Sequence, residues 1–241
     1  NPADTGLLTG HDKELDKPYI FATIQTLSQD EILHTFAPDT FDYIVIDEVH
    51  HGGAGTYQKV IRYFQPKFLL GMTATPERSD DFDIYALFHH HIAYEIRLHD
   101  ALEENMLVPF HYHGISEITV NGKVLDDMSD FSLLTCEERV KHILYYADLY
   151  GSDADRIKGL VFCRNVDEAQ ALAEAFRQHG KRAVALTGAS SERERSEAIG
   201  HLEAKAAEDP QYLDYIFTCD IFNEGVDIPQ VNQVIMLRPT T

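Results

Sequence analysis

The chain has 241 residues, of which 44% are hydrophobic and 25% charged, a composition typical of a folded protein of one or two domains. No apolar run reaches the ~18 residues of a membrane span and no secretory signal is present, so we expect a cytoplasmic protein with no membrane partner. The three cysteines form no Cys-x-x-Cys pair, which argues against structural zinc. The formal net charge of −20 argues against broad electrostatic binding of nucleic acid, although nine of the 20 Lys and Arg lie between Arg156 and Lys205.

The first segment, to about Tyr94, has an α/β pattern. Three short apolar runs predict strands: FATIQTL (21–27), FDYIVID (41–47) and KFLLGMTAT (67–75). Helical stretches at 29–36 and 57–64 alternate with these runs. The alternation indicates a parallel sheet covered by helices on both faces.

The pattern loosens between about Glu95 and Tyr150. Asn121-Gly122 separates two short runs of β-forming residues, which is a strong hairpin signal. Residues 135–150 then have helical spacing, and the tyrosines at 145, 146 and 150 fit packing for that helix better than base stacking. We expect residues 106–150 to form a connector with a small β-hairpin.

The α/β pattern returns at Lys158. KGLVFCRN (158–165) predicts a strand, and the next 15 residues predict an amphipathic helix that ends at Gly180. RAVALTG (182–188) predicts a strand, and the helix that starts at Ser190 has a Ser-x-x-Glu capping box near its beginning. The segments YIFTCDIFNEGVDIP (215–229) and QVIMLRP (233–239) complete the pattern. We therefore predict two α/β domains of similar build, at 1–105 and 151–241, on either side of the connector.

Two adjacent carboxylates follow the second predicted strand. Parallel sheets bind ligands at the carboxyl ends of their strands, and Asp47 and Glu48 lie at such an end. One carboxylate there can hold a hydrated Mg²⁺ and the other can orient a water for attack on a phosphate. Alternatively, Asp47 simply caps the following turn.

Five motifs in order resemble those of superfamily 2 helicases, which consist of two RecA-like domains. DEVH (47–50) resembles motif II, the DExH box, and GMTATP (71–76) resembles motif III. The remaining three are similar to motifs Ib, IV and V: FATIQTL (21–27), GLVFCRN (159–165) and FNEGVDIP (222–229). The form of these motifs is most similar to the bacterial helicases grouped with type III restriction enzyme res subunits, which are often fused to nuclease modules.

The resemblance implies ATP and Mg²⁺ as cofactors and specific roles for residues. Asp47 would bind Mg²⁺ through water, Glu48 would polarise the attacking water, and His50 would contact motif III. Thr73 and Thr75 would couple hydrolysis to movement between the domains, and Gly225 and Asp227 would bind the nucleotide.

The expected partner is nucleic acid, and the resemblance favours DNA. Thr23 and Gln25 in motif Ib would face a strand of it. Further candidates for backbone contacts lie at the ends of predicted strands: Arg164, Thr187, Gly188 and Thr218. Arg193 and Arg195 fit either such a track or, more simply, a solvated helix face with glutamate partners.

Two further helicase motifs do not occur in the chain. There is no G-x-x-x-x-G-K-[ST] sequence for binding phosphates, and motif VI would be expected just beyond the final LRPTT. We expect this chain to be part of a longer helicase and its first domain to be truncated. We expect the chain alone to hydrolyse ATP poorly or not at all.

Two other functions stay open. The chain could be a helicase-derived module that binds nucleic acid or protein without ATPase activity. More remotely, Asp47, Glu48, His50 and His51 could form the metal site of a phosphoesterase. The run His89–His91 does not favour a metal site, because consecutive side chains do not converge on one ion.

Overall fold

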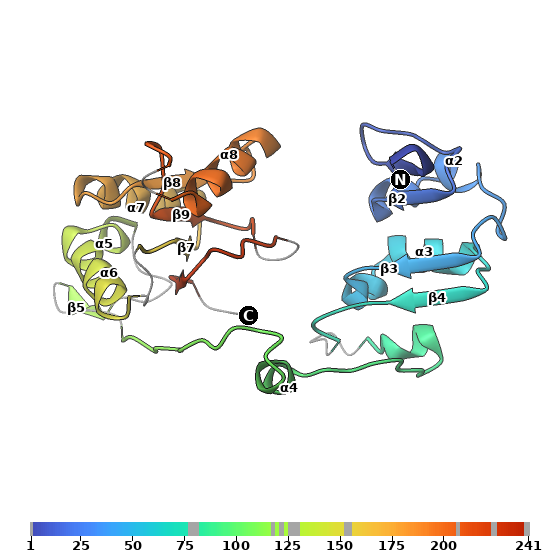
Figure 1. Cartoon of the computed structure of the whole chain (residues 1–241), viewed down its shortest axis with the longest axis horizontal. Coiled ribbons are helices and arrows are strands. Elements are labelled where there is room, and N and C mark those ends of the chain that lie inside the picture. The colour runs from blue at the N-terminus through green and yellow to red at the C-terminus, as the bar shows by residue number, and fades with distance from the viewer. Residues whose placement is uncertain are drawn as a thin grey trace. The chain divides into compact units, whose positions relative to one another are not determined.

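The structure is a computed structural model that places the chain in two compact units, Asn1–Phe110 and His111–Thr241 (Figure 1). It describes residues 2–76, 82–116, 119–120, 123–124, 131–151, 156–205, 208–222 and 226–238. No helix among these residues is long and apolar enough to cross a membrane.

The strands described in unit 1 form two parallel pairs. β1 (Thr5–Leu8) pairs with β2 (Tyr19–Ala22), and β3 (Tyr43–Ile46) pairs with β4 (Phe68–Gly71). The predicted strands at 41–47 and 67–75 are thus present in shorter form. β1 was not predicted, because TGLL is only four residues long and contains a glycine.

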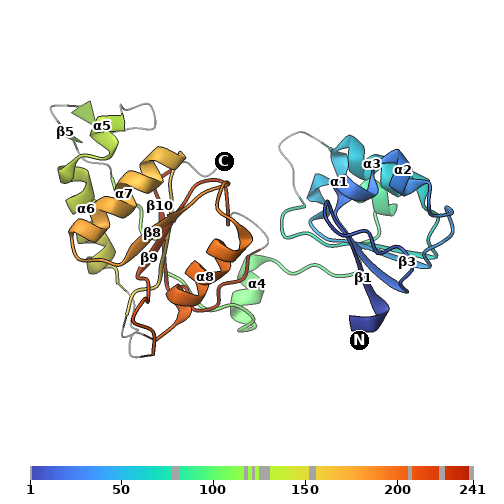
Figure 2. The same ribbon diagram turned by 90° about the horizontal axis from the view of Figure 1, so that it is seen from above.

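Helices α1 (Ile24–Leu27), α2 (Asp30–Leu33) and α3 (Gly55–Tyr63) cover one face of these strands (Figure 2). The other helices described in unit 1 are η1 (Pro2–Asp4), η2 (Val49–Gly53), η3 (Tyr85–Phe88) and α4 (Leu98–Glu103). Leu8, Ile32, Leu33, Phe36, Val60 and Phe64 form the buried core. Alternate strand residues point the other way and are exposed: Leu7, Tyr19, Phe21, Tyr43, Val45 and Phe68.

The prediction of a strand over 21–27 is wrong in its second half. β2 ends at Ala22, and α1 begins at Ile24. The carbonyl of Thr23 accepts hydrogen bonds from the amides of Thr26 (3.1 Å) and Leu27 (3.0 Å), and the Thr23 hydroxyl donates to Thr26 Oγ1 (2.9 Å). These local bonds turn the chain into a helix although β-branched residues favour a strand.

Within the described residues of unit 2, four strands form one parallel sheet in the order β10-β7-β9-β8. They are β7 (Gly159–Phe162), β8 (Ala183–Leu186), β9 (Tyr215–Thr218) and β10 (Gln233–Met236). Every residue of β7 and β9 is buried, as expected for central strands covered on both faces. The predicted α/β class with parallel sheets is confirmed.

Helices lie on both faces of this sheet (Figure 2). α6 (Glu137–Leu149) and α7 (Val166–Gln178) pack on one face, and α8 (Glu192–Glu203) packs on the other. α6 therefore belongs to the core of unit 2, although its sequence lies in the predicted connector. α5 (Phe131–Leu134) precedes it, and the predicted hairpin is present as antiparallel β5 (Thr119–Val120) and β6 (Lys123–Val124).

The predicted helix ends of unit 2 are confirmed. The Ser191 amide donates to Glu194 Oε2 (2.7 Å), and the Glu194 amide donates to Ser191 Oγ (3.3 Å), which completes the capping box. Gly180 has φ +80°, and the next amide, of Lys181, donates to the Phe176 carbonyl (3.0 Å). This is the Schellman arrangement that favours glycine after a helix.

Candidate active site

The two carboxylates lie in a tight turn at the carboxyl end of β3. Asp47 is exposed, and its Oδ1 accepts a hydrogen bond from the Glu48 amide (3.0 Å). Glu48 adopts a left-handed backbone conformation (φ 48°, ψ 45°) and precedes η2. Residues other than glycine seldom adopt this conformation, so the turn is strained at a predicted catalytic residue.

His50 connects this turn to the segment after β4. Its Nδ1 lies 3.2 Å from Glu48 Oε2 and 3.1 Å from Thr73 Oγ1. The His50 side chain is only 12% exposed, so these contacts fix its ring. Thr73 Oγ1 also accepts a hydrogen bond from the Thr75 amide (3.1 Å). The structure thus brings together Glu48, His50, Thr73 and Thr75, whose catalytic and coupling roles stay predictions.

The pairing of β3 with β4 fixes the distance between the carboxylate turn and the segment that carries Thr73. Beyond the last pair of the ladder, Ile46 with Gly71, the Met72 amide donates to the Ile46 carbonyl (2.8 Å). The Val49 amide then donates to the Met72 carbonyl (2.9 Å). A Cβ on Gly71 would lie 2.4 Å from Phe88 Cζ, so a larger residue would push apart the packing beneath the site.

Two residues of α3 near the turn were not predicted from the sequence. Gln58 Nε2 donates to the Gly52 carbonyl (2.8 Å) and so holds η2 against the helix. Burial, together with the nearby carboxylates of Glu48 and Asp47, raises the pKa of Tyr57. No motif identifies either residue, because their contacts depend on the path of the chain after the DEVH sequence.

The two residues of unit 1 that are predicted to face a nucleic-acid strand lie at the start of α1. Thr23 and Gln25 are both exposed. α1 is joined to α3 by Lys59, whose Nζ donates to the Ser28 carbonyl (2.6 Å) and pairs with Asp30 (2.9 Å). One helix, α3, therefore contacts both η2, which follows the carboxylates, and α1, at whose start Thr23 and Gln25 lie.

The candidates of unit 2 gather at the carboxyl edge of its sheet. Arg164 follows β7, Thr187 and Gly188 follow β8, and Thr218 ends β9. Because these strands are parallel, all four residues lie at the same edge. Of the predicted nucleotide-binding residues, Gly225 lies outside the described residues and Asp227 is exposed.

The residues of unit 2 that are predicted to contact nucleic acid differ in how accessible they are. The Thr187–Gly188 turn presents an open glycine, and Arg195 holds it by donating to the Thr187 (3.3 Å) and Gly188 (3.1 Å) carbonyls. Thr218 is fully buried and donates its hydroxyl to the Ile221 carbonyl (3.1 Å), so its side chain points inward. Arg193 pairs with Glu197 (2.7 Å) on an exposed helix face, which agrees with the solvated alternative for that residue.

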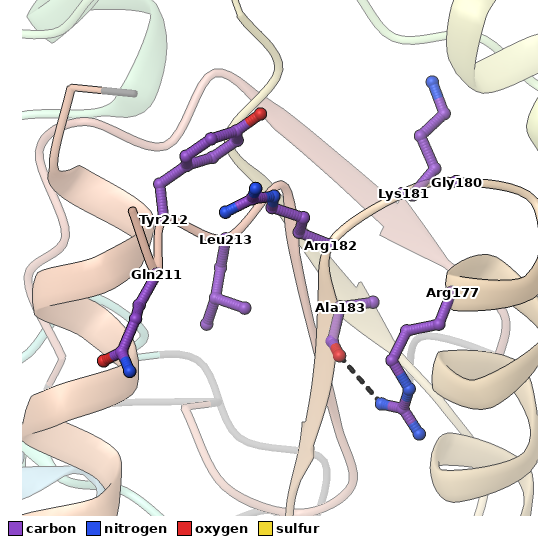
Figure 3. A pocket seen from close by; sticks show the side chains of 8 residues that line it. All are labelled: Arg177, Gly180, Lys181, Arg182, Ala183, Gln211, Tyr212 and Leu213. Atoms are coloured by element: carbon purple, nitrogen blue, oxygen red, sulfur yellow. Dashed lines mark hydrogen bonds between the residues drawn. The ribbon is translucent and has the colours of Figure 1, made fainter. Parts of the chain in front are cut away.

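A shallow hollow lies at the opposite edge of the same sheet (Figure 3). Residues around the start of β8 and before β9 line it: Arg177, Gly180, Lys181, Arg182, Ala183, Gln211, Tyr212 and Leu213. Its basic side chains already have partners, since Arg177 donates to the Ala183 carbonyl (2.8 Å), Lys181 pairs with Asp148 (2.7 Å) and Arg182 stacks on Tyr212 (4.1 Å). We do not assign the function to it, because ligands of parallel sheets bind at the other edge.

The donor set at the turn fits Mg²⁺ held through water, which needs one or two carboxylates beside the phosphates of a nucleotide. Asp47 offers such an exposed carboxylate at a strand end. Among the described residues, no three or more His, Cys, Asp or Glu side chains are grouped closely enough to hold a metal ion by themselves.

Two protein families match the sequence. Residues 2–78 match the type III restriction enzyme res subunit, and residues 138–241 match the helicase conserved C-terminal domain. A 51.5 kDa protein of a Lactococcus phage is 24% identical over 82% of this chain, and the putative ATP-dependent helicase IRC3 of Saccharomyces cerevisiae is 23% identical over 93%. The chain spans 42% and 33% of the lengths of these relatives.

Solved helicase structures share the fold. Saccharomyces cerevisiae Dbp5 bound to RNA and ADP BeF3 aligns over 97% of this chain and 55% of its own, with a TM-score of 0.51 at 16% identity. The Pyrococcus furiosus Hef helicase domain aligns over 97% and 74%, with a TM-score of 0.50 at 13% identity. The fold is thus that of the two-domain RecA-like helicases. With matches to the res subunit in unit 1 and to the helicase C-terminal domain in unit 2, the chain belongs to the superfamily 2 helicases and is similar to type III restriction res subunits.

Proposed function

We propose that this chain is part of an ATP-dependent nucleic-acid helicase or translocase. The observation that carries the proposal is the contact of His50 Nδ1 with both Glu48 Oε2 and Thr73 Oγ1. It ties the predicted hydrolytic carboxylate to the segment predicted to respond to hydrolysis.

The turn after β3 suits the chemistry of phosphate hydrolysis. Mg-ATP, when bound, supplies the phosphate that is transferred to water. Asp47 would hold the metal through water, and Glu48 would orient the attacking water and accept its proton. His50 contacts the Glu48 carboxylate, so protonation of Glu48 would alter a contact shared with Thr73. Asp227 and Gly225 would bind the nucleotide from unit 2.

We propose DNA as the nucleic acid, because the res subunit that unit 1 resembles belongs to a restriction enzyme. Thr23 and Gln25 of unit 1 and the carboxyl edge of the unit 2 sheet would contact the sugar-phosphate backbone. Contacts of this kind need few positive groups, which is compatible with a net charge of −20. Fused nuclease or restriction modules would extend the natural protein.

The test is ATP hydrolysis with and without single-stranded DNA by the full natural protein that contains this sequence. Glu48→Gln should lower the stimulated rate by about 10²–10⁴-fold, the typical contribution of general acid–base catalysis. Glu31→Gln, an exposed carboxylate of the same unit, serves as the control and should leave the rate unchanged. DNA-stimulated hydrolysis that survives Glu48→Gln would falsify the catalytic assignment.

A paired histidine comparison tests the coupling role. His50→Ala should reduce the stimulation by DNA more than the basal rate, because it removes the contact with Thr73. His51→Ala, at the exposed neighbouring position, should preserve both. Equal loss of basal and stimulated rates in His50→Ala would assign this histidine to hydrolysis alone.

The binding-only alternative makes a different prediction. The natural protein would then bind single-stranded DNA, with an affinity that falls as salt rises, but would not hydrolyse ATP. The chain alone is also expected to hydrolyse ATP poorly, because it contains no G-x-x-x-x-G-K-[ST] sequence.

A further inference from the structure

A buried carboxylate joins three segments of unit 2. Glu168, in the first turn of α7, is 0% exposed. Its Oε1 accepts a hydrogen bond from Arg139 Nη1 (2.9 Å), and its Oε2 accepts one from the Arg164 amide (2.9 Å). Arg139 belongs to α6 and Arg164 to the turn after β7, so a single side chain connects α6, α7 and that turn.

The other contacts of this cluster fix it further. Arg139 is 1% exposed and also donates to the Leu134 carbonyl (2.8 Å). The Glu168 amide donates to Asn165 Oδ1 (2.8 Å), the cap of α7. A buried charge is tolerated only when it is paired and hydrogen-bonded, and loss of either partner exposes the other to a large desolvation penalty. This cluster is therefore rigid.

The cluster around Glu168 fixes the position of Arg164, which is predicted to contact a nucleic-acid strand. Arg164 Nε lies 3.6 Å from Glu168 Oε2, and the Arg164 side chain is 15% exposed, so only its outer part faces solvent at the carboxyl edge of the sheet. We propose that Glu168 is a positioning residue that holds Arg164 and its turn for contact with a nucleic-acid backbone, and that Arg139 ties this turn to α6. The inference rests on the proposed function, which places Arg164 beside a phosphate.

The direction in which Glu168→Gln changes DNA binding distinguishes a positioning role of Glu168 from competition with phosphate for Arg164. If Glu168 merely competed with phosphate for the Arg164 guanidinium, removing its charge would strengthen binding. If it positions the turn, Glu168→Gln weakens binding, because an amide has one acceptor oxygen and must turn its NH2 toward one of the two donors.

Binding of a single-stranded DNA oligonucleotide by the whole chain, measured by fluorescence anisotropy at several salt concentrations, provides the test. Arg164→Ala, the reference, should weaken binding about 3–10-fold and reduce the salt slope by about 0.7, as expected for one lost phosphate contact. Glu168→Gln should reproduce both changes. Glu174→Gln is the matched control, because Glu174 pairs with Arg177 on the exposed face of the same helix (3.1 Å).

A double variant separates loss of the positioning role from loss of folding. The double change Arg139→Met with Glu168→Leu replaces the ion pair with apolar groups, an exchange that proteins often tolerate. It should keep a cooperative melt, weaken DNA binding as Arg164→Ala does, and speed amide exchange at Arg164 at least about 10-fold through loss of a charge-assisted hydrogen bond.

Unchanged or tighter binding in Glu168→Gln, or unchanged amide protection in the double variant, overturns the positioning inference. If Arg164→Ala weakens binding while the Glu168 variants do not, the inference fails and the proposed function stands. If the unchanged chain does not bind the oligonucleotide, both fail together.

Discussion

The two units use parallel strands in different ways. In unit 2, β7 and β9 are buried on both faces, between α6 and α7 on one side and α8 on the other. In unit 1, α1, α2 and α3 cover one face of two separate strand pairs, and aromatic side chains such as Tyr43 and Phe68 are exposed on the other. Because parallel sheets are stable when both faces are covered, we expect unit 2 to be the more stable of the two.

The largest expected effect is a matched pair of phenylalanine changes. Phe217 in β9 is 0% exposed and packs against Phe176 with ring centres 4.8 Å apart, whereas Phe68 in β4 is 49% exposed. Phe217→Ala should destabilise unit 2 by about 3–5 kcal/mol, and Phe68→Ala should change the stability of unit 1 by less than about 0.5 kcal/mol. Urea unfolding followed by hydrogen exchange in each unit measures both. A large loss from Phe68→Ala would show that the open face of unit 1 is covered in solution.

An ion-pair comparison is expected to have a similar or slightly smaller effect. Arg139→Met leaves Glu168 without its buried partner and should destabilise unit 2 by about 3–5 kcal/mol. Lys67→Met in unit 1 removes an exposed pair with Asp42 (2.8 Å) and should leave the unfolding midpoint unchanged. Equal shifts for both variants would mean that the Arg139–Glu168 pair is open to solvent.

Two glycines sharpen the comparison within unit 2. Gly180→Ala should destabilise by about 1–2 kcal/mol, because only glycine adopts φ +80° without strain. Gly200→Ala, inside α8 where a Cβ meets nothing within 4 Å, should stabilise by about 0.5–1 kcal/mol. Melting curves of the two variants should shift in opposite directions, and a shared direction would contradict the helix end or the helix interior assigned here.

The smallest effect is a difference in cysteine reactivity. All three cysteines lie in unit 2, so alkylation reports on that unit alone. Burial raises the pKa of Cys163 and Cys219, which leaves less thiolate at pH 8, while Cys136 is partly exposed. Mass spectrometry of the native protein should find Cys136 alkylated first. Early alkylation of Cys163 would indicate that the core of unit 2 opens readily.

The sequence was most informative where local rules decide the structure. Gly180 and the Ser191–Glu194 box predicted two helix ends of unit 2, because capping depends on neighbouring residues. The strand before the carboxylates was equally clear, since the β-branched run at 44–46 strongly favours a strand. The order of the motifs along the chain also indicated the family.

Both local and long-range contacts explain where the predictions from sequence failed. The segment 21–27 was misread because the turn at Thr23 depends on hydrogen bonds within α1, which override strand propensity. No motif in the sequence identifies Glu168, which the packing of α6 on α7 buries beside Arg139. The hydrogen bond from Gln58 to the Gly52 carbonyl depends on the path of η2, which the sequence did not predict.

The left-handed backbone of Glu48 implies a trade-off between stability and function. At φ 48°, glycine would relieve strain that costs about 1–2 kcal/mol, so the chain retains a carboxylate at a position whose backbone favours having no side chain. Selection for folding alone would replace this residue, whereas selection for a working site would keep it. Libraries screened only for thermal stability should therefore become enriched in Glu48→Gly, and libraries screened for activity should be depleted of it.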